Sequence, residues 1–303
     1  MGDSAGDASR SPPGPPGVTI RIAGAAVLAA LITAPVAMAQ TLRTLASSRQ
    51  LHGESALTVN VTYVAGRLHL TPAAPGTLYQ MEMRYDEDKF TPVRAYDAGT
   101  GALSLGLKSR GHVTMDSRGR DGDVPTLDLA LATGVPLALS VELGAAEADM
   151  EFGGIALAKL RFQTGASQSQ VRFSRPNPVQ CDSLTLEAGA AQFTAAALGN
   201  ANCRHLRVEG GVGAIALDFT GTWSGPADAQ IHLALGTLKL QLPRSLGVAI
   251  TLDRFLASFD QSGFTRHGDV YYSDNYRSAR YHLDVKVESA FGGIQVLWVN
   301  DSR

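Results

Sequence analysis

The chain has 303 residues, of which 45% are hydrophobic and 18% are charged, and its formal net charge is −2. This balance excludes the basic profile of a nucleic-acid-binding protein and the low hydrophobicity of a disordered chain. The 32 glycines favour many short strands joined by tight turns. The 2 cysteines are too few for a structural zinc site made of cysteine alone.

The N-terminal segment, from Met1 to Ala39, has the order of a secretory signal peptide. Arg21 precedes an uncharged stretch, residues 22–39, which ends in Ala37-Met38-Ala39. A basic residue, an apolar core and an A-x-A ending predict cleavage after Ala39. The alternative is an uncleaved membrane anchor, but a spanning helix needs about 20 apolar residues and this stretch is shorter. We therefore expect an exported protein, in the periplasm or on the extracytoplasmic face of the envelope, with a mature N-terminal segment at 40–56.

Residues 57–110 contain four strand-like runs that do not follow the repeat described below. Alternating polar and apolar residues at these runs predict a small antiparallel β module that covers one end of the repeat. A polar, glycine-rich link, 111–123, follows it. The runs are Leu57–Val64, Gly66–Leu70, Leu78–Tyr85 and Ala102–Leu105.

Residues 124–303 carry an internal repeat. Five strand-like runs each end at a glycine, and successive glycines lie 21, 24, 22 and 25 residues apart. Alternation at period two sends one side chain inward and the next outward, and a glycine between two short strands permits a sharp bend. Coils stacked about 4.8 Å apart would merge their inward rows into one core. The pattern predicts an all-β solenoid with a C-terminal cap, phased on Gly144, Gly165, Gly189, Gly211 and Gly236.

The alternation also predicts which side chains face the core. A β-sandwich or jelly roll is the alternative, although its turns need not recur at near-constant spacing. Only Asp253–Phe259 could form a short helix. The inward candidates are Leu139, Val141, Leu143, Leu160, Phe162, Leu184, Leu186, Leu206, Val208, Ile231 and Leu233.

The two cysteines occupy equivalent positions in consecutive coils. Cys181 lies eight residues before Gly189, and Cys203 lies eight before Gly211. Stacked Cα atoms about 4.8 Å apart fall in the range that a disulfide bridges. We predict a disulfide between Cys181 and Cys203, with a pair of buried thiols as the alternative.

The C-terminal strands are expected to cap the solenoid. Tyr281–Val287 and Ile294–Val299 read as strands joined around a double glycine, and an open last coil would recruit other chains. Tyrosine and arginine are favoured at interfaces, so this region supplies the candidate partner-contact residues, with a packed cap as the alternative. They are Tyr271, Tyr272, Tyr276, Arg277 and Arg280.

Several segments resemble the bacterial toastrack (LiaF-like) envelope proteins. The resemblance is carried by Leu198–Asn202, Leu206–Gly213, Leu217–Gly221, Tyr272–Tyr276 and Gly292–Val296, with Gly66–Leu70 near the start. It covers about residues 57–299 and implies a single-stranded β-helix with adaptor or sensory roles at the envelope. It implies no catalytic residues.

The sequence contains no recognisable set of catalytic, cofactor-binding or metal-ligating residues. Gly211–Ala216 matches G-x-G-x-x-A, but a strand follows where a dinucleotide site needs a helix. His205 and His232 lie in comparable parts of neighbouring coils, without a clear third ligand. The acidic loops at 86–88 and 121–123 lack a calcium-binding pattern.

The leading hypothesis is a non-catalytic, exported scaffold or adaptor that acts through protein–protein contacts. Its partner would be an envelope or membrane protein, or another copy bound through the solenoid ends, with no nucleic acid and no small-molecule cofactor. The alternative is an envelope-stress sensor that binds a surface ligand such as a peptide or glycan.

Overall fold

The computed structural model describes residues 42–111 and 124–300, apart from the side chains of 191 and 254–257. These residues belong to one compact unit, Gln40–Arg303. The expected signal peptide and residues 112–123 of the expected link lie outside the described residues. No helix in the described part reaches the length and hydrophobicity that crossing a membrane requires.

The described residues form an all-β protein. They contain one short 3-10 helix, Leu198–Ala201, and fifteen strands joined in one sheet. The strands are β1 (Leu42–Gln50), β2 (Leu57–Pro72), β3 (Thr77–Asp86), β4 (Phe90–Asp97), β5 (Ala102–Ser109), β6 (Thr126–Leu131), β7 (Leu137–Glu151), β8 (Leu157–Arg172), β9 (Cys181–Ala196), β10 (Cys203–Asp218), β11 (Ala227–Pro243), β12 (Gly247–Phe259), β13 (Phe264–His267), β14 (Val270–Ser273) and β15 (His282–Val299).

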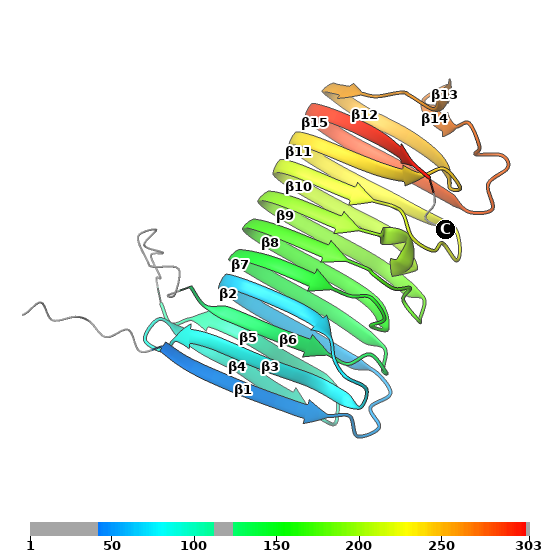
Figure 1. Cartoon of the computed structure of the whole chain (residues 1–303). Coiled ribbons are helices and arrows are strands. Elements are labelled where there is room, and N and C mark those ends of the chain that lie inside the picture. Colours follow the sequence, from blue (N-terminus) through cyan, green and yellow to red (C-terminus); the bar gives the residue numbers. More distant parts are fainter. Residues whose placement is uncertain (1–41, 112–123, 301–303) are drawn as a thin grey trace, which may run out of the picture. The chain divides into compact units, whose positions relative to one another are not determined.

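Eight long strands stack in parallel in the order β2-β7-β8-β9-β10-β11-β15-β12 (Figure 1). Equivalent apolar residues align from strand to strand along Val141, Phe162, Leu186, Val208 and Ile231. All eleven side chains expected to face inward are buried, with 3% exposure or less. The core is therefore built from matched rows, as the alternation predicts.

Each long strand bends near its middle, and the inward row changes parity there. In β10 the buried residues closest to the bend are Leu206 and Val208 before it and Ile215 and Leu217 after it. This change keeps both halves of the strand facing the same core. The expected phase is wrong at the fifth coil, because Gly236 pairs with Gly213 and not with Gly211.

The N-terminal end differs from the expected antiparallel module. The runs at 57–64 and 66–70 form one strand, β2, which pairs in parallel with β7 and is itself a layer of the stack. Below it, β5 pairs in parallel with the first half of β2, and β6 with the second half. Only β1, β3 and β4 run antiparallel to their neighbours. The apolar row of β2 aligns with that of β7, so stacking there buries more surface than a separate layer would.

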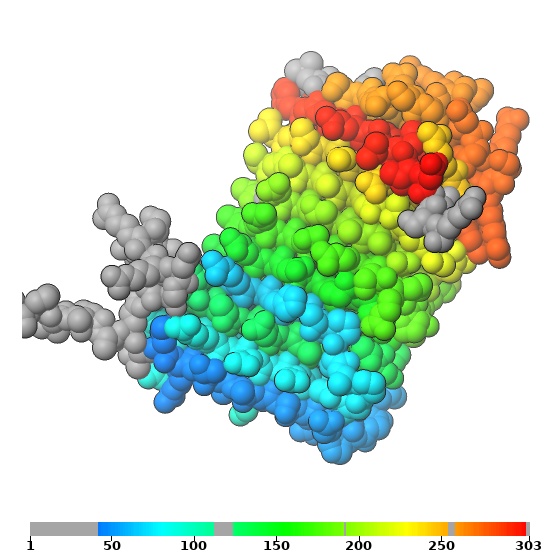
Figure 2. Space-filling model, in the orientation of Figure 1, coloured from blue at the N-terminus to red at the C-terminus, as the bar shows by residue number. Residues whose placement is uncertain are grey.

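The C-terminal strand β15 is not a cap. It lies between β11 and β12, parallel to both, and the red band of β15 is visible between yellow and orange bands in Figure 2. Its pattern matches β11 over sixteen register positions, including Gly236 with Gly292. The stack ends instead in β12, whose free side pairs antiparallel with β14, followed by β13. Asp253–Phe259, the one segment for which a short helix, a cap or a loop was considered, belongs to β12, because it pairs with β15.

A disulfide links Cys181 and Cys203 at the start of β9 and β10. Their Cα atoms are 4.2 Å apart, and the two residues are register partners, as their equal offsets from Gly189 and Gly211 predict. Cys181 is fully buried and Cys203 is 8% exposed. The bond staples two neighbouring layers of the stack.

We expect reduction of this disulfide to lower the free energy of unfolding by about 3 kcal/mol. The bond closes a loop with a sequence separation of 22 residues, and such a cross-link restricts the unfolded chain by about that amount. Urea denaturation with and without reductant measures the effect. The double variant Cys181→Ala/Cys203→Ala should give the lower value in both conditions. Equal stability of the oxidised and reduced protein would contradict the prediction.

Candidate functional site

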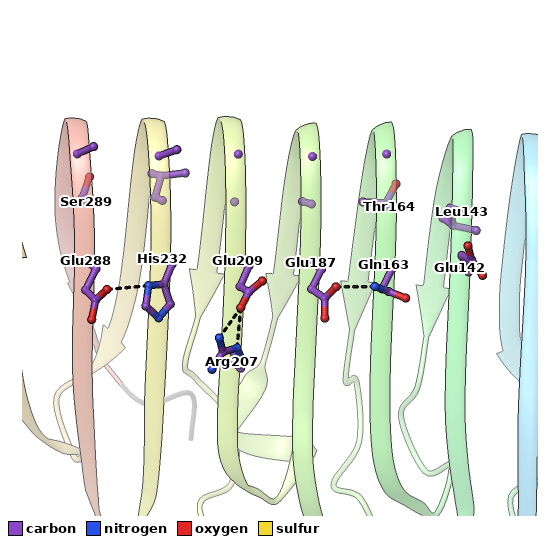
Figure 3. A pocket seen from close by; sticks show the side chains of 18 of the residues that line it. Glu142, Leu143, Gln163, Thr164, Glu187, Arg207, Glu209, His232, Glu288 and Ser289 are labelled. Carbon is purple, nitrogen blue, oxygen red and sulfur yellow. Dashed lines mark hydrogen bonds and ion pairs between the residues drawn. The ribbon is translucent and has the colours of Figure 1, made fainter.

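A row of mostly acidic side chains crosses seven parallel strands just before their bends. It lies in an open groove of about 1070 Å³ on the outer face of the first strand halves. Each member is the register partner of the next (Figure 3). We call it the acidic row; its members are Glu142, Gln163, Glu187, Glu209, His232, Glu288 and Asp253.

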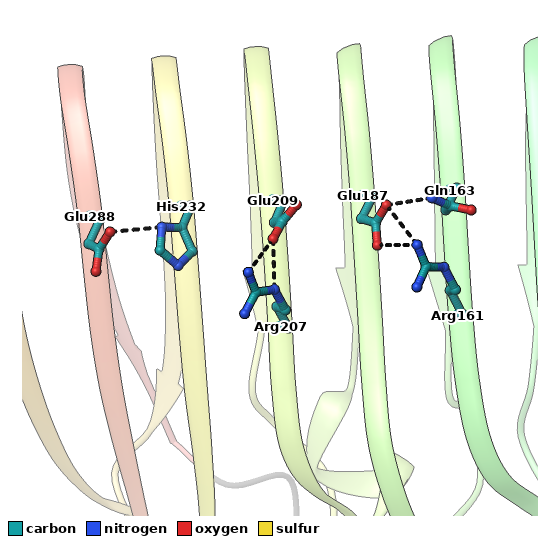
Figure 4. A network of polar contacts seen from close by, with 7 residues as sticks. All are labelled: Arg161, Gln163, Glu187, Arg207, Glu209, His232 and Glu288. Carbon is teal, nitrogen blue, oxygen red and sulfur yellow. Dashed lines mark hydrogen bonds and ion pairs between the residues drawn. The ribbon is translucent and has the colours of Figure 1, made fainter.

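A second row, two residues earlier in the strands, carries the opposite charge. We call Arg161, Arg207 and Lys286 the basic row. Arg161 lies 2.9 Å from Glu187, and Arg207 lies 2.6 Å from Glu209 (Figure 4). Lys286 lies 2.5 Å from Glu288. Exposed pairs of this kind add little to stability. Arg207 and Lys286 pair within their own strands, whereas Arg161 pairs with a residue of the next strand.

His232 contacts another member of the acidic row, Glu288. Its Nδ1 lies 2.9 Å from Oε2 of Glu288 on the neighbouring strand. His205, which the sequence placed in a comparable part of the adjoining coil, instead aligns with Asp228 and lies 2.6 Å from its carboxylate. His232 aligns with Glu209. The two histidines are therefore four positions out of register, and each has its own carboxylate partner.

The electrostatics of Glu288 follow from these contacts. A hydrogen bond from the Lys286 ammonium holds the pKa of Glu288 below its ordinary value, and the nearby His232 lowers it further. Because the folded pKa is depressed, the contact contributes stability above the ordinary carboxyl range. That contribution is lost as the pH falls through the folded pKa.

We expect Lys286→Met to raise the pKa of Glu288 towards its ordinary value. The variant removes the hydrogen bond that stabilises the charged carboxylate. A carbon-detected NMR titration of the Glu288 carboxyl measures the shift, and Lys239→Met, a change at an exposed lysine outside the groove, is the control. An unchanged Glu288 titration in Lys286→Met would contradict the assignment.

The five predicted contact residues divide into three groups. Tyr271 is buried at 5% exposure and packs against Phe259, with ring centroids 5.0 Å apart, so its assignment as a contact residue is wrong. Tyr272 and Tyr276 line a second groove of about 720 Å³, with ring centroids 4.9 Å apart. Arg277 and Arg280 are exposed but lie outside that groove.

The second groove joins the tyrosines to the same outer face. His205, Asp228 and Asp284 occupy one register row that continues through Ala249 to Tyr272. The Tyr276 hydroxyl donates to Oδ1 of Asp284 over 3.2 Å. Burial, together with the nearby Asp284, raises the pKa of Tyr276. The small Ala249 side chain leaves a hollow between the carboxylates and the aromatic wall.

Sequence reasoning missed the acidic row as a unit. Its first four members each lie two residues before a coil glycine, at Gly144, Gly165, Gly189 and Gly211, so their common offset was a readable signal. His232 and Glu288 likewise lie two residues before Ala234 and Ala290, but no glycine at those positions marks them as members of the row. In the described part of the chain, no group of three or more His, Cys, Asp or Glu side chains is placed to hold a metal ion.

One known protein family matches about half of the chain. The family described as the N-terminal domain of toast_rack, DUF2154, matches residues 39–195. No curated protein matches the chain.

Three solved bacterial structures are similar at low sequence identity. A putative cell adhesion protein from Clostridium sporogenes is 16% identical, with a TM-score of 0.47, covering 85% of this chain and 100% of the other. A putative adhesin from Bacteroides fragilis is 11% identical, with a TM-score of 0.34 and coverage of 84% and 97%. A putative adhesin from Parabacteroides merdae is 10% identical, with a TM-score of 0.26 and coverage of 85% and 96%.

Proposed function

We propose, from the premise that the chain belongs to the toast_rack N-terminal domain family, that it is a non-catalytic scaffold or adaptor exported to the bacterial cell envelope. It acts through protein–protein contacts. In this proposal the parallel stack is a β-solenoid of single-stranded coils, and its outer face is the surface that binds the partner.

The acidic and basic rows are the observation that carries the proposal. The acidic row crosses consecutive hydrogen-bonded strands, and the basic row lies on every second strand, β8, β10 and β15. The spacing within both rows is therefore fixed by the strand spacing, about 4.8 Å per strand. A rigid face with charges at fixed intervals suits an extended protein surface, because such a partner loses little further freedom on a preorganised face. Complementary charge then selects partner and register.

The disulfide supports the proposed location. Disulfides form and persist in oxidising compartments such as the bacterial periplasm. The bond between Cys181 and Cys203 is buried inside the stack, which suits a protein that folds after export. The basic and apolar order of residues 21–39 favours the same location.

Isolation of cross-linked complexes from native envelopes tests the function. We expect a discrete protein partner with the wild-type chain, and loss of that partner with Glu187→Gln/Glu209→Gln/Glu288→Gln. The matched control, Glu82→Gln/Asp149→Asn, changes two exposed acidic residues outside the groove and should retain the partner. Turnover of an envelope polysaccharide by the purified protein would overturn the non-catalytic function.

A surface-ligand sensor is the second candidate, and the tyrosine-lined groove favours it. Tyr272 and Tyr276 offer aromatic rings beside the carboxylates of Asp228 and Asp284, a combination of apolar wall and oriented polar groups found in ligand sites. A glycan array hit that Tyr272→Ala abolishes, without any protein partner, would favour this function over the adaptor.

Self-association through the ends is a further form of the adaptor. In the described residues, β1 and β13 each pair with one neighbour only, at the two ends of the strand order. Edges of this kind can pair with another chain. Sedimentation of the mature protein over a range of concentrations distinguishes a monomer from end-to-end assemblies.

A further inference from the structure

An exposed apolar ridge runs along the bends of the C-terminal strands. Val212, Leu235 and Phe291 are 52%, 48% and 44% exposed, and they are register partners on β10, β11 and β15. The same row continues towards the N-terminal end through Ala190 and Ala166, which are also exposed. The side chains therefore grow from alanine to phenylalanine along the stack.

The surroundings of the ridge make it prominent. Val212 stands between two glycines, Leu235 between Ala234 and Gly236, and Phe291 between Ala290 and Gly292. Each of the three large side chains therefore has a small residue on either side of it in its own strand. Large apolar side chains gathered on an otherwise polar surface mark interaction sites.

The acidic row lies beside the ridge. Glu209, His232 and Glu288 each precede a ridge residue by three positions in the same strand. The basic row lies two residues further away, so the order across the face is apolar, acidic, basic. Five carboxylates of the groove face three basic side chains, and Glu142 and Asp253 have no ion pair among the described residues.

We propose that the ridge and the acidic row together form a docking surface for a protein segment whose apolar side chains are flanked by lysine or arginine. The apolar side chains of the segment pack on Val212, Leu235 and Phe291, and its basic groups meet the carboxylates of the acidic row. This proposal rests on the adaptor function and specifies the chemistry of its partner.

Charge complementarity selects this occupant over others. With five carboxylates against three basic side chains, the groove beside the ridge carries an excess of negative charge, which repels an anionic lipid surface and attracts basic side chains. A second copy of the chain would bring a second acidic row to the same region. A basic and apolar segment is the occupant that satisfies both halves of the surface.

The test uses the mature chain and two labelled twelve-residue peptides, one of alternating leucine and lysine and one of alternating leucine and glutamate. Fluorescence anisotropy should show that the lysine peptide binds at least tenfold more tightly than the glutamate peptide. Leu235→Ser/Phe291→Ser should weaken it at least tenfold, and so should Glu187→Gln/Glu209→Gln/Glu288→Gln. Leu297→Ser is the matched control, because Leu297 lies on the same strand as Phe291 and is also 44% exposed.

The proposal would be overturned by equal binding of both peptides, by equal weakening by Leu297→Ser, or by ridge-dependent binding of anionic phospholipid vesicles in place of the lysine peptide. Ridge-dependent dimerisation in sedimentation would assign the surface to a second copy. Native complexes that form unchanged with Leu235→Ser/Phe291→Ser would reject this surface while leaving the adaptor function intact. Circular dichroism of every variant verifies that the fold is retained.

Discussion

Gly236→Ala is expected to destabilise the protein by at least about 4 kcal/mol or to prevent folding. Gly236 lies at the bend of β11 with a φ of +140°, and an added Cβ would lie 1.8 Å from the carbonyl oxygen of Gly213. Strands on both sides fix this position, because Gly213, Gly236 and Gly292 are register partners. Relief would require separating hydrogen-bonded strands, in addition to the strain of the positive φ. Urea denaturation followed by circular dichroism measures the loss.

Gly134→Ala is the matched control for this prediction. An added Cβ at Gly134 has no heavy atom within 4 Å, and its φ lies outside the strained region. Its free energy of unfolding should stay within about 0.5 kcal/mol of the wild-type value. If Gly236→Ala proved as stable as Gly134→Ala, the stacked register of β10, β11 and β15 would be wrong.

Asn177→Leu is expected to cost about 4 kcal/mol. The Asn177 side chain is buried and binds the coils on either side of its own: its Nδ2 donates to the carbonyls of Leu157 (2.8 Å) and Ala201 (3.0 Å). Its Oδ1 accepts from the amides of Leu157 and Val179, both at 3.2 Å. Leucine has a similar volume but leaves buried backbone groups without partners, at about 1–3 kcal/mol each.

The comparison variant is Asn60→Leu, at an exposed position of β2. It should change the free energy of unfolding by about 0.5 kcal/mol or less. Thermal and urea denaturation of both variants give the difference. Similar stabilities for the two would mean that Asn177 does not tie the loops of successive coils together.

The local alternation of apolar and polar residues was sufficient to predict the inward-facing side chains of the repeated coils. The alternation in β7–β11 predicts the inward rows, because each strand from β7 to β10 pairs with the strand that follows it in the sequence. Gly236 was assigned the wrong phase because its register partner in β10 is Gly213, which lies two residues after Gly211. A glycine in the sequence indicates that a bend is near, but the hydrogen-bond register between strands determines which residue lies at the bend.

Non-local pairing could not be read in the same way. β2 pairs with β7, as between Val61 and Val141, although β3 to β6 separate the two strands in the sequence. β15 pairs with β11, as between Val287 and Ile231, and precedes β12 in space although it follows it in sequence. Alternation determines which face of a strand is buried, but it does not determine which strand lies beside it. The expected N-terminal layer and C-terminal cap failed for this reason.

The candidate site also has a part that local pattern predicts and a part that depends on non-local strand pairing. Glu142, Gln163, Glu187 and Glu209 have a constant offset from their glycines, but Glu288 joins them only through the insertion of β15. The ridge also depends on this insertion, because Phe291 meets Leu235 across β15 and β11. Tyr271 was expected at a surface and is buried, because the antiparallel pairing of β14 with β12 turns it towards Phe259.

Photo-cross-linking in native envelopes tests the adaptor function and its docking surface most directly. A photoreactive amino acid replaces Leu235 on the ridge or, as the control, the similarly accessible Leu297, and mass spectrometry identifies the attached residues. We predict that position 235 attaches to one discrete protein, at a segment with lysine or arginine next to apolar residues, and that position 297 does not. Attachment only to lipid, only to another copy, or equally from both positions would contradict it.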